Sequence, residues 1–210
     1  MGSKTKIEYC DATINPYIGC KHGCPYCYAK RMNDRFHFVK KWDEPEEQEG
    51  WQYKIPKKPA IIFMGSMTDL FGEWVDNGFI EDMLQDCESF PFHKFLFLTK
   101  NPKRYPYFNF PQNCWKGATV ADGHYYAASE SDCDFISIEP FIPSNFKMLV
   151  AWDSLKWVII GGMTPKNQHE KKDVDKLINF YKSKPIFLKS NLHYPKVIQE
   201  FPAELVGGGG

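Results

Sequence analysis

Three cysteines stand close together near the start of the chain, where Cys20, Cys24 and Cys27 form a C-x3-C-x2-C array. Glycines beside and within the array let the backbone fold back, so three thiolates can come from a single loop. A structural zinc site needs four protein ligands, usually as two separated pairs, and the 210 residues contain no second C-x2-C pair. Three cysteines instead suit a 4Fe-4S cluster in which one iron stays open for a small ligand. The alternative is a zinc ion with His22 as its fourth ligand.

The residues around this array resemble those of the radical S-adenosylmethionine (SAM) superfamily. An aromatic residue, Tyr26, precedes the last cysteine, as in the superfamily signature. The string N-P-x-x-G-C…C-x-x-C-Y-A, with L-T-K-x-P at 98–102 and S-I-E-P at 137–140, is similar to a phage- and bacteria-encoded subfamily catalogued as a domain of unknown function. The resemblance runs over residues 4–205. It implies that the open iron binds SAM, and that one electron cleaves SAM to methionine and a 5′-deoxyadenosyl radical that takes hydrogen from a substrate.

The composition predicts a single globular domain over residues 1–206, followed by a flexible glycine tail at 207–210. Hydrophobic residues make up 43% of the chain, which is enough for a sizeable core. The 26 basic residues balance 26 acidic ones, so the net charge indicates neither nucleic acid nor membrane as a partner. No apolar run approaches the roughly eighteen residues of a membrane span. Seven cysteines, three of them clustered, fit a reducing compartment, so we expect a monomeric cytoplasmic protein of a bacterial cell or phage-infected host.

Short apolar runs alternate with longer polar stretches along the chain. The predicted strands are residues 6–11, 60–64, 94–99, 117–120, 135–139, 156–161 and 185–189. The predicted helices are residues 28–38, 78–88, 125–131, 144–149 and 174–183. Strands separated by helices indicate an α/β fold with a parallel sheet. Because the chain is short for an eight-unit barrel, we predict a partial, open β/α barrel of the radical SAM type with about six to seven parallel strands.

Polar residues and glycines follow several predicted strands, at ends that lie on one side of a parallel sheet. The predicted cofactor-binding residues are Tyr26, Gly65, Ser66, Asp69, Thr99, Lys100, Thr119, Ser137, Glu139, Gly161, Gly162 and Lys189. Lys100 is expected to pair with the SAM carboxylate, and Ser137 and Glu139 share one face of their strand. A structural salt bridge is the alternative for Glu139, and a capped loop is the alternative for residues 65–69.

One segment, residues 38–59, interrupts the regular pattern with a long excursion. It carries Trp42, Trp51 and Tyr53 between runs of lysine and glutamate. Aromatic residues interleaved with lysines can stack on bases and contact phosphate. The equally weighted alternative is a solvated loop whose tryptophans pack as a lid.

These features predict a radical SAM enzyme whose reaction is of isomerase, lyase or transferase type. The resemblance to a phage-encoded subfamily favours a modified or hypermodified nucleobase in DNA or a nucleotide as the substrate. A peptide or a small metabolite is the second enzyme hypothesis. A zinc-stabilised nucleic-acid-binding module without catalysis is the hypothesis from another class. The expected partner is a reductant of flavodoxin or ferredoxin type, and no membrane partner is expected.

Overall fold

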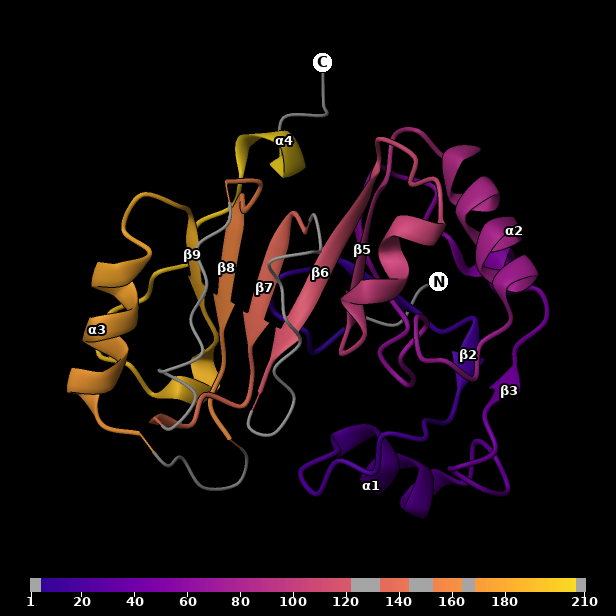
Figure 1. Ribbon diagram of the computed structural model, residues 1–210, viewed down its shortest axis with the longest axis horizontal. Coiled ribbons are helices and arrows are strands. Elements are labelled where there is room, and N and C mark those ends of the chain that lie inside the picture. Colours follow the sequence, from indigo (N-terminus) through magenta and orange to yellow (C-terminus); the bar gives the residue numbers. More distant parts are fainter. Residues whose placement is uncertain (1–4, 122–132, 144–152, 164–168, 207–210) are drawn as a thin grey trace.

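Seven parallel strands form a single curled sheet in the computed structural model (Figure 1). The structure describes residues 5–121, 133–143, 153–163 and 169–206. The strands are β1 Ala12–Ile14, β4 Ile61–Met64, β5 Lys94–Thr99, β6 Cys114–Val120, β7 Phe135–Ile138, β8 Trp157–Ile160 and β9 Ile186–Leu188. They are adjacent in the order β1-β4-β5-β6-β7-β8-β9, so each strand is added on the same side of the previous one. The sheet therefore curls in one direction as a half-barrel, and the predicted α/β fold on an open parallel sheet is confirmed.

Within the described ranges, helices α2 and α3 cover the outer face of this half-barrel. Helix α2, Asn77–Glu88, begins where the Asp76 carboxylate accepts the N–H of Phe79. Its buried residues recur with helical spacing and are Ile80, Met83, Leu84 and Cys87. Helix α3, Lys171–Phe180, packs Val174 and Leu177 against β8 and β9. No helix in the described ranges is long and apolar enough to cross a membrane.

The other helical elements of the described residues are shorter or lie away from the sheet. They are α1 Tyr28–Phe36, η1 Trp51–Lys54, η2 Pro102–Tyr107, η5 Ser190–Leu192 and α4 Ala203–Val206. Helix α1 lies at the C-terminal ends of the strands, at the lower edge of Figure 1, and buries only Ala29 and Asn33. The predicted helix at 28–38 is thus confirmed, although it does not pack on the outer face as α2 and α3 do.

Aromatic side chains fill the concave side of the sheet. This layer includes Tyr9, Phe63, Trp115, Phe135, Trp157 and Phe187. The Tyr9 ring meets the rings of Phe63, Trp157 and Phe187 edge-on, at centroid distances of 5.8, 6.0 and 6.0 Å. Gly117 makes room for the layer, because a Cβ atom there would lie 2.2 Å from the Phe135 ring. The layer fills the inside of the half-barrel and leaves space at the C-terminal ends of the strands.

The predicted first strand at residues 6–11 is wrong, since these residues form no strand and the first strand is β1. They alternate apolar and polar side chains as a strand does, but Tyr9 turns into the aromatic layer between β4 and β9. The Glu8 carboxylate accepts two hydrogen bonds from the Ser190 N–H (2.9 and 3.1 Å) and one from its hydroxyl (2.9 Å). Residues 5–11 therefore link the two sides of the open half-barrel.

The 38–59 segment is more ordered than the sequence predicted. Glu46–Glu47, strand β3, pairs with β2, Tyr17–Ile18, in a small antiparallel sheet. Trp51 is buried in the core, whereas Tyr53 is 94% exposed, so these two aromatic residues serve different purposes. The predicted helices at 125–131 and 144–149 and the tail at 207–210 lie outside the described residues.

Candidate functional site

A cavity of about 550 Å³ opens where the parallel strands end and the cysteine loop crosses over them. The predicted site residues that line it are Cys20, Cys24, Tyr26, Cys27, Gly65, Ser66, Asp69, Lys100, Thr119, Ser137, Glu139, Gly162 and Lys189. Two predicted residues, Thr99 and Gly161, are not among the lining residues, but each contacts one of them, Asp69 and Glu139 respectively. Parallel α/β folds commonly bind their ligands at this end of the strands, so the cavity is the candidate site.

The three cysteines share one loop between β2 and α1, and all three are free thiols. Gly19 starts the loop with a φ of +106°, and a Cβ atom there would lie 2.8 Å from the Trp42 carbonyl oxygen. Cys27 caps α1, because its Sγ accepts the N–H of Lys30 at 3.3 Å. Burial raises the pKa of Cys20 to about 12, so this residue is a neutral thiol until a metal displaces its proton.

The cysteine sulfurs do not surround one point. Within the described part of the chain, no three His, Cys, Asp or Glu side chains are arranged as ligands of a single metal ion. Burial also raises the pKa of Cys24, while the positive charge of Lys100 lowers it. Lys100 thus lies close enough to the loop to favour negative charge there.

The loop that follows β4 is tied to the cysteine loop by hydrogen bonds. The Ser66 hydroxyl donates to Asn15 Oδ1 at 3.0 Å, and the Tyr28 hydroxyl donates to the Ser66 carbonyl oxygen at 2.6 Å. The Thr68 hydroxyl donates to the Gly19 carbonyl oxygen, also at 2.6 Å. Much of the polar character of this loop is therefore used to hold the cysteine loop in place.

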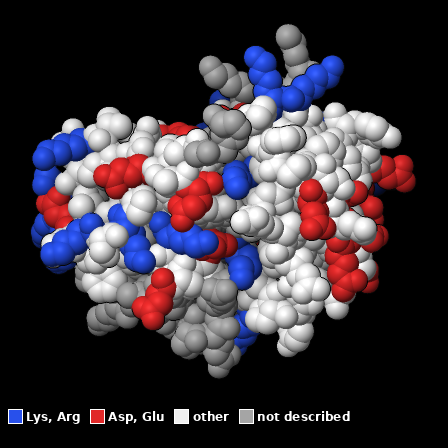
Figure 2. Space-filling view, turned by 90° about the horizontal axis from the view of Figure 1, so that it is seen from above, with Lys and Arg blue, Asp and Glu red and all other residues white. Residues whose placement is uncertain are grey.

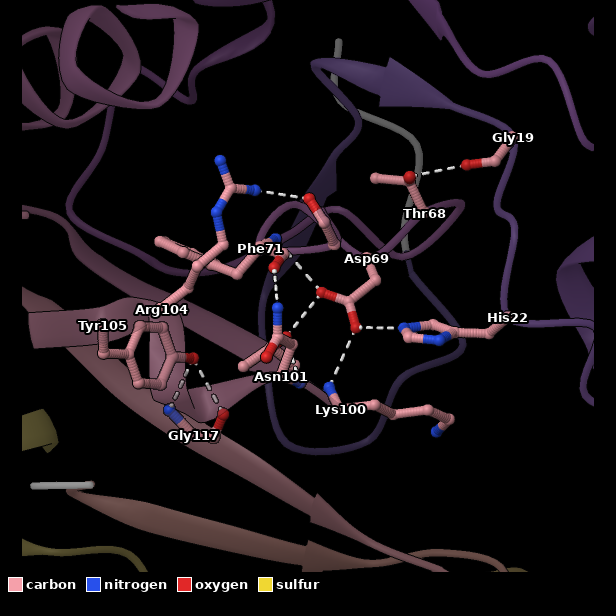
Figure 3. A network of polar contacts seen from close by, with 12 residues as sticks. Gly19, His22, Thr68, Asp69, Phe71, Lys100, Asn101, Arg104, Tyr105 and Gly117 are labelled. Carbon is pink, nitrogen blue, oxygen red and sulfur yellow. Dashed lines mark hydrogen bonds and ion pairs between the residues drawn. The ribbon is translucent and has the colours of Figure 1, made fainter. Parts of the chain in front are cut away.

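Asp69 is the centre of this attachment (Figure 3). Its Oδ2 atom lies 2.7 Å from His22 Nε2 and accepts the Lys100 N–H at 2.8 Å. Its Oδ1 atom accepts the Thr99 hydroxyl at 2.6 Å and the Phe71 N–H at 3.1 Å. The carboxylate, only 5% exposed, joins the cysteine loop to the end of β5. Both oxygens are occupied by protein donors, which makes Asp69 a positioning residue for the loop.

The charge of Asp69 is stabilised by these partners. Burial alone raises the pKa of a carboxyl group, but the hydrogen bond and charge of His22 and the bonds from Thr99 and the Lys100 N–H outweigh it. The pKa of Asp69 is therefore lowered from its ordinary value of 3.8. The network needs the ionised form, because all of the hydrogen bonds to Asp69 use its oxygens as acceptors.

On the other side of the cavity, Glu139 forms an ion pair with Lys189. This is the salt-bridge alternative for Glu139, although both side chains still line the cavity. Gly161 makes the pair possible, because a Cβ atom there would lie 2.8 Å from the Glu139 carboxyl carbon. The Lys189 ammonium also lies 5.9 Å from the centre of the Tyr9 ring. Glu139 and Lys100 meet at the same cavity, as predicted, but Lys189 is the partner of Glu139.

Ser137 and Gly162 complete this side. Two hydrogen bonds hold the backbone of Gly162, whose N–H donates to Asn191 Oδ1 at 3.0 Å and whose carbonyl accepts from Asn191 Nδ2 at 2.9 Å. Ser137 lines the cavity, and its hydroxyl is buried and has no hydrogen-bond partner in the described structure. An unpartnered buried hydroxyl costs free energy, so Ser137 marks a point where a ligand can supply the missing bond.

Sequence reasoning missed several residues of the site. Asn15 and Tyr28 belong to the cysteine motif, but no structural role was predicted for either. Arg31 and Trp42 line the cavity, and Lys6 reaches it from the segment mispredicted as a strand. The alternation that suggested a strand gave no signal for this placement.

The chain matches one known family along most of its length. A model of the family described as Protein of unknown function (DUF5131) matches residues 4–176. This range contains the cysteine loop and the ends of the strands up to β8. No curated protein and no solved structure matches the chain.

Proposed function

Because the chain belongs to the family described as Protein of unknown function (DUF5131), a description that gives no activity, we propose its function from the site itself. The proposed function is that of a radical SAM enzyme. The observation that carries this proposal is that Cys20, Cys24 and Cys27 line the same cavity as the polar ends of the parallel strands. Metal ligands and the groups suited to a polar cofactor thus face one space.

The donor set supports a 4Fe-4S cluster over a single ion. Each cysteine of such a cluster binds a different iron, so the three sulfurs do not have to meet at one point. A zinc ion needs four ligands converging at about 2.0–2.3 Å, which the described His, Cys, Asp and Glu side chains do not provide. Cys20, Cys24 and Cys27 would hold the cluster.

Reduced by an external electron donor, the bound cluster would supply the electron that cleaves SAM and starts hydrogen abstraction. The residues of this chain would bind SAM and orient it. Lys100 offers a positive charge for the SAM carboxylate, on the side of the cavity nearest Cys24. Asn191 holds both the N–H and the carbonyl of Gly162, and because Gly162 has no side chain, its backbone can pack against a flat ring. The paired Glu139 and Lys189 offer an acceptor and a donor at the opposite wall.

The buried hydroxyl of Ser137 gives a test that separates binding from folding. Ser137→Ala removes an unpartnered buried group, so the ligand-free protein is expected to gain about 1 kcal/mol of stability, and SAM is expected to bind roughly fivefold to tenfold more weakly. Urea unfolding and calorimetric titration measure the two effects. Ser66→Ala is the matched control, because it loses a hydrogen bond to Asn15 and should lower stability. Unchanged SAM affinity in Ser137→Ala would remove Ser137 from the binding site.

A second candidate function has one observation in its favour. Histidines that bind zinc commonly donate their other ring N–H to a carboxylate, and His22 Nε2 lies 2.7 Å from Asp69 Oδ2. A zinc-stabilised module without catalysis would use His22 with the three cysteines.

Metal analysis of anaerobically purified protein decides between the two functions. We expect about four irons per chain and formation of 5′-deoxyadenosine from SAM after reduction with dithionite. If the protein instead contains one zinc per chain and takes up no iron on reconstitution with iron and sulfide, the proposed enzyme is wrong and the zinc-stabilised module is the function.

A further inference from the structure

Helix α1 presents an unusually bare apolar stripe to solvent. Tyr28, Met32 and Phe36 recur every four residues along one face and are 47%, 39% and 53% exposed. Phe38 follows the helix, is 48% exposed and lies with its ring centre 5.8 Å from that of Phe36. Tyr28 also lines the cavity, so the stripe begins at the cavity rim.

Positive charge accompanies this stripe. Residues 28–41 contain five basic side chains and one acidic one, in a protein with equal numbers of both. Lys30 pairs with Asp34 and Lys41 pairs with Glu44, whereas Arg35 and Lys40 have no ion-pair partner in the described structure. The Arg35 guanidinium lies 5.0 Å from the centre of the Phe36 ring. Cation and ring thus form one combined surface.

The same charge continues into the cavity. Its wall carries Lys6, Arg31 and Lys100, which have no ion-pair partner among the described residues. Its two carboxylates, Asp69 and Glu139, are both bound to protein donors. An anionic ligand is therefore favoured along the whole path from α1 to the cavity.

Other charged surfaces of the protein differ from this one. Figure 2 looks down on the end of the molecule away from α1, where basic side chains gather over the left half with acidic ones among them. On α3, Lys171 and Lys172 are paired with Asp175 and Glu170. The acidic residues of β3 lie on the side of the molecule that α2 occupies (Figure 1).

We propose that this α1 face, formed by Tyr28, Met32, Arg35, Phe36, Phe38 and Lys40, binds a single-stranded nucleic acid and leads one of its bases toward the cavity. Exposed rings stack on bases and cations contact the phosphates, and only a single strand offers free base faces. An acidic protein would also suit basic and aromatic side chains, but it would stop at the rim, whereas the unpaired cations continue inside. A reaction at that base rests on the proposed function. Binding of the single strand by the α1 face does not depend on the proposed function.

Fluorescence anisotropy with a fluorescein-labelled 15-nucleotide oligothymidylate tests the proposal on anaerobically purified protein. Phe36→Ala combined with Phe38→Ala is expected to weaken binding at least tenfold. Arg35→Gln combined with Lys40→Gln removes two phosphate contacts and should reduce the slope of log affinity against log salt by about 1.4. Matched controls on α3 are Phe180→Ala, a ring also 48% exposed, and Lys171→Gln with Lys172→Gln. Both controls should bind as wild type does.

The possible outcomes separate this inference from the proposed enzyme. Equal losses in the α3 controls, wild-type binding in both α1 variants, or equally tight binding of a 15-base-pair duplex would overturn the nucleic-acid surface. If an acidic flavodoxin binds at α1 and the oligonucleotide does not, the α1 face is a protein interface and not a nucleic-acid surface. If the protein binds the oligonucleotide through α1 but contains zinc and no iron, the nucleic-acid surface stands and the proposed enzyme is wrong. If it contains four irons but does not bind the oligonucleotide, the enzyme stands and the nucleic-acid surface is wrong.

Discussion

Replacing Cys20, Cys24 or Cys27 with Ala is expected to abolish SAM cleavage and to leave the reconstituted protein without a stable 4Fe-4S cluster. Each cysteine would be the sole protein ligand of one iron, and no other cysteine lines the cavity within the described residues. Iron content, visible absorption and 5′-deoxyadenosine formation measure the loss. A variant that keeps full iron would show that its cysteine is not a ligand.

Cysteines elsewhere in the chain supply the control for this experiment. Cys87 and Cys133 are fully buried in the hydrophobic core, away from the cavity. Cys87→Ala and Cys133→Ala remove a small apolar group, so they are expected to lower stability modestly and leave the iron content unchanged. Equal iron loss in these variants would mean that the assay reports on folding and not on the ligands.

Asp69→Ala is expected to destabilise the fold by about 3–5 kcal/mol, the largest loss expected from a single polar side chain. The substitution leaves buried partners without an acceptor, among them the Thr99 hydroxyl and the Lys100 N–H. Urea unfolding measures the change. Asp34→Ala removes an exposed ion pair with Lys30 and should cost less than about 1 kcal/mol. Similar losses in both variants would contradict the central position of Asp69.

The same residue makes stability depend on pH in a defined direction. The folded-state pKa of Asp69 is lowered below the ordinary 3.8, so its contribution is fully present above that value. It is lost as the pH falls through the lowered folded-state pKa, because the protonated carboxyl can no longer accept all of its bonds. The difference in unfolding free energy between wild type and Asp69→Asn should therefore shrink from pH 7 to pH 3. A constant difference would mean that Asp69 is not stabilised as a carboxylate.

The sequence predicted the later strands better than the first one. Strand β5 matches its predicted range, because it contains the continuous apolar run Phe95–Leu98, which is largely buried on both faces. Residues 6–11 misled the prediction because Tyr9 packs on rings far away in the sequence, and alternation describes only the local chain. The small sheet of β2 and β3 was missed for a related reason, since each strand has two residues and no periodicity.

The members of the candidate site were easier to predict than their partners. Parallel strands bring their C-terminal ends to one side, so Lys100, Ser137 and Glu139 had to face a common space. The pairing of the charged side chains depends on the curl of the sheet. The curl brings Lys189 to Glu139 and leaves Lys100 near Cys24. The hydrogen bonds of Asp69 depend on how the cysteine loop crosses the strands. No spacing in the sequence encodes that crossing.

The contacts of residues 5–11 also determine the order in which this protein can fold. Glu8 and Ser190 are 182 residues apart, and Tyr9 needs Phe187 as a neighbour. Contacts between such distant residues form late, because a long loop must close before they are made. During synthesis, a nascent chain that has not reached β9 already contains the cysteine loop but cannot complete the cavity, which Lys6, Ile7 and Tyr9 help to line. Residues 5–11 therefore take their final positions only after β9 has been synthesised.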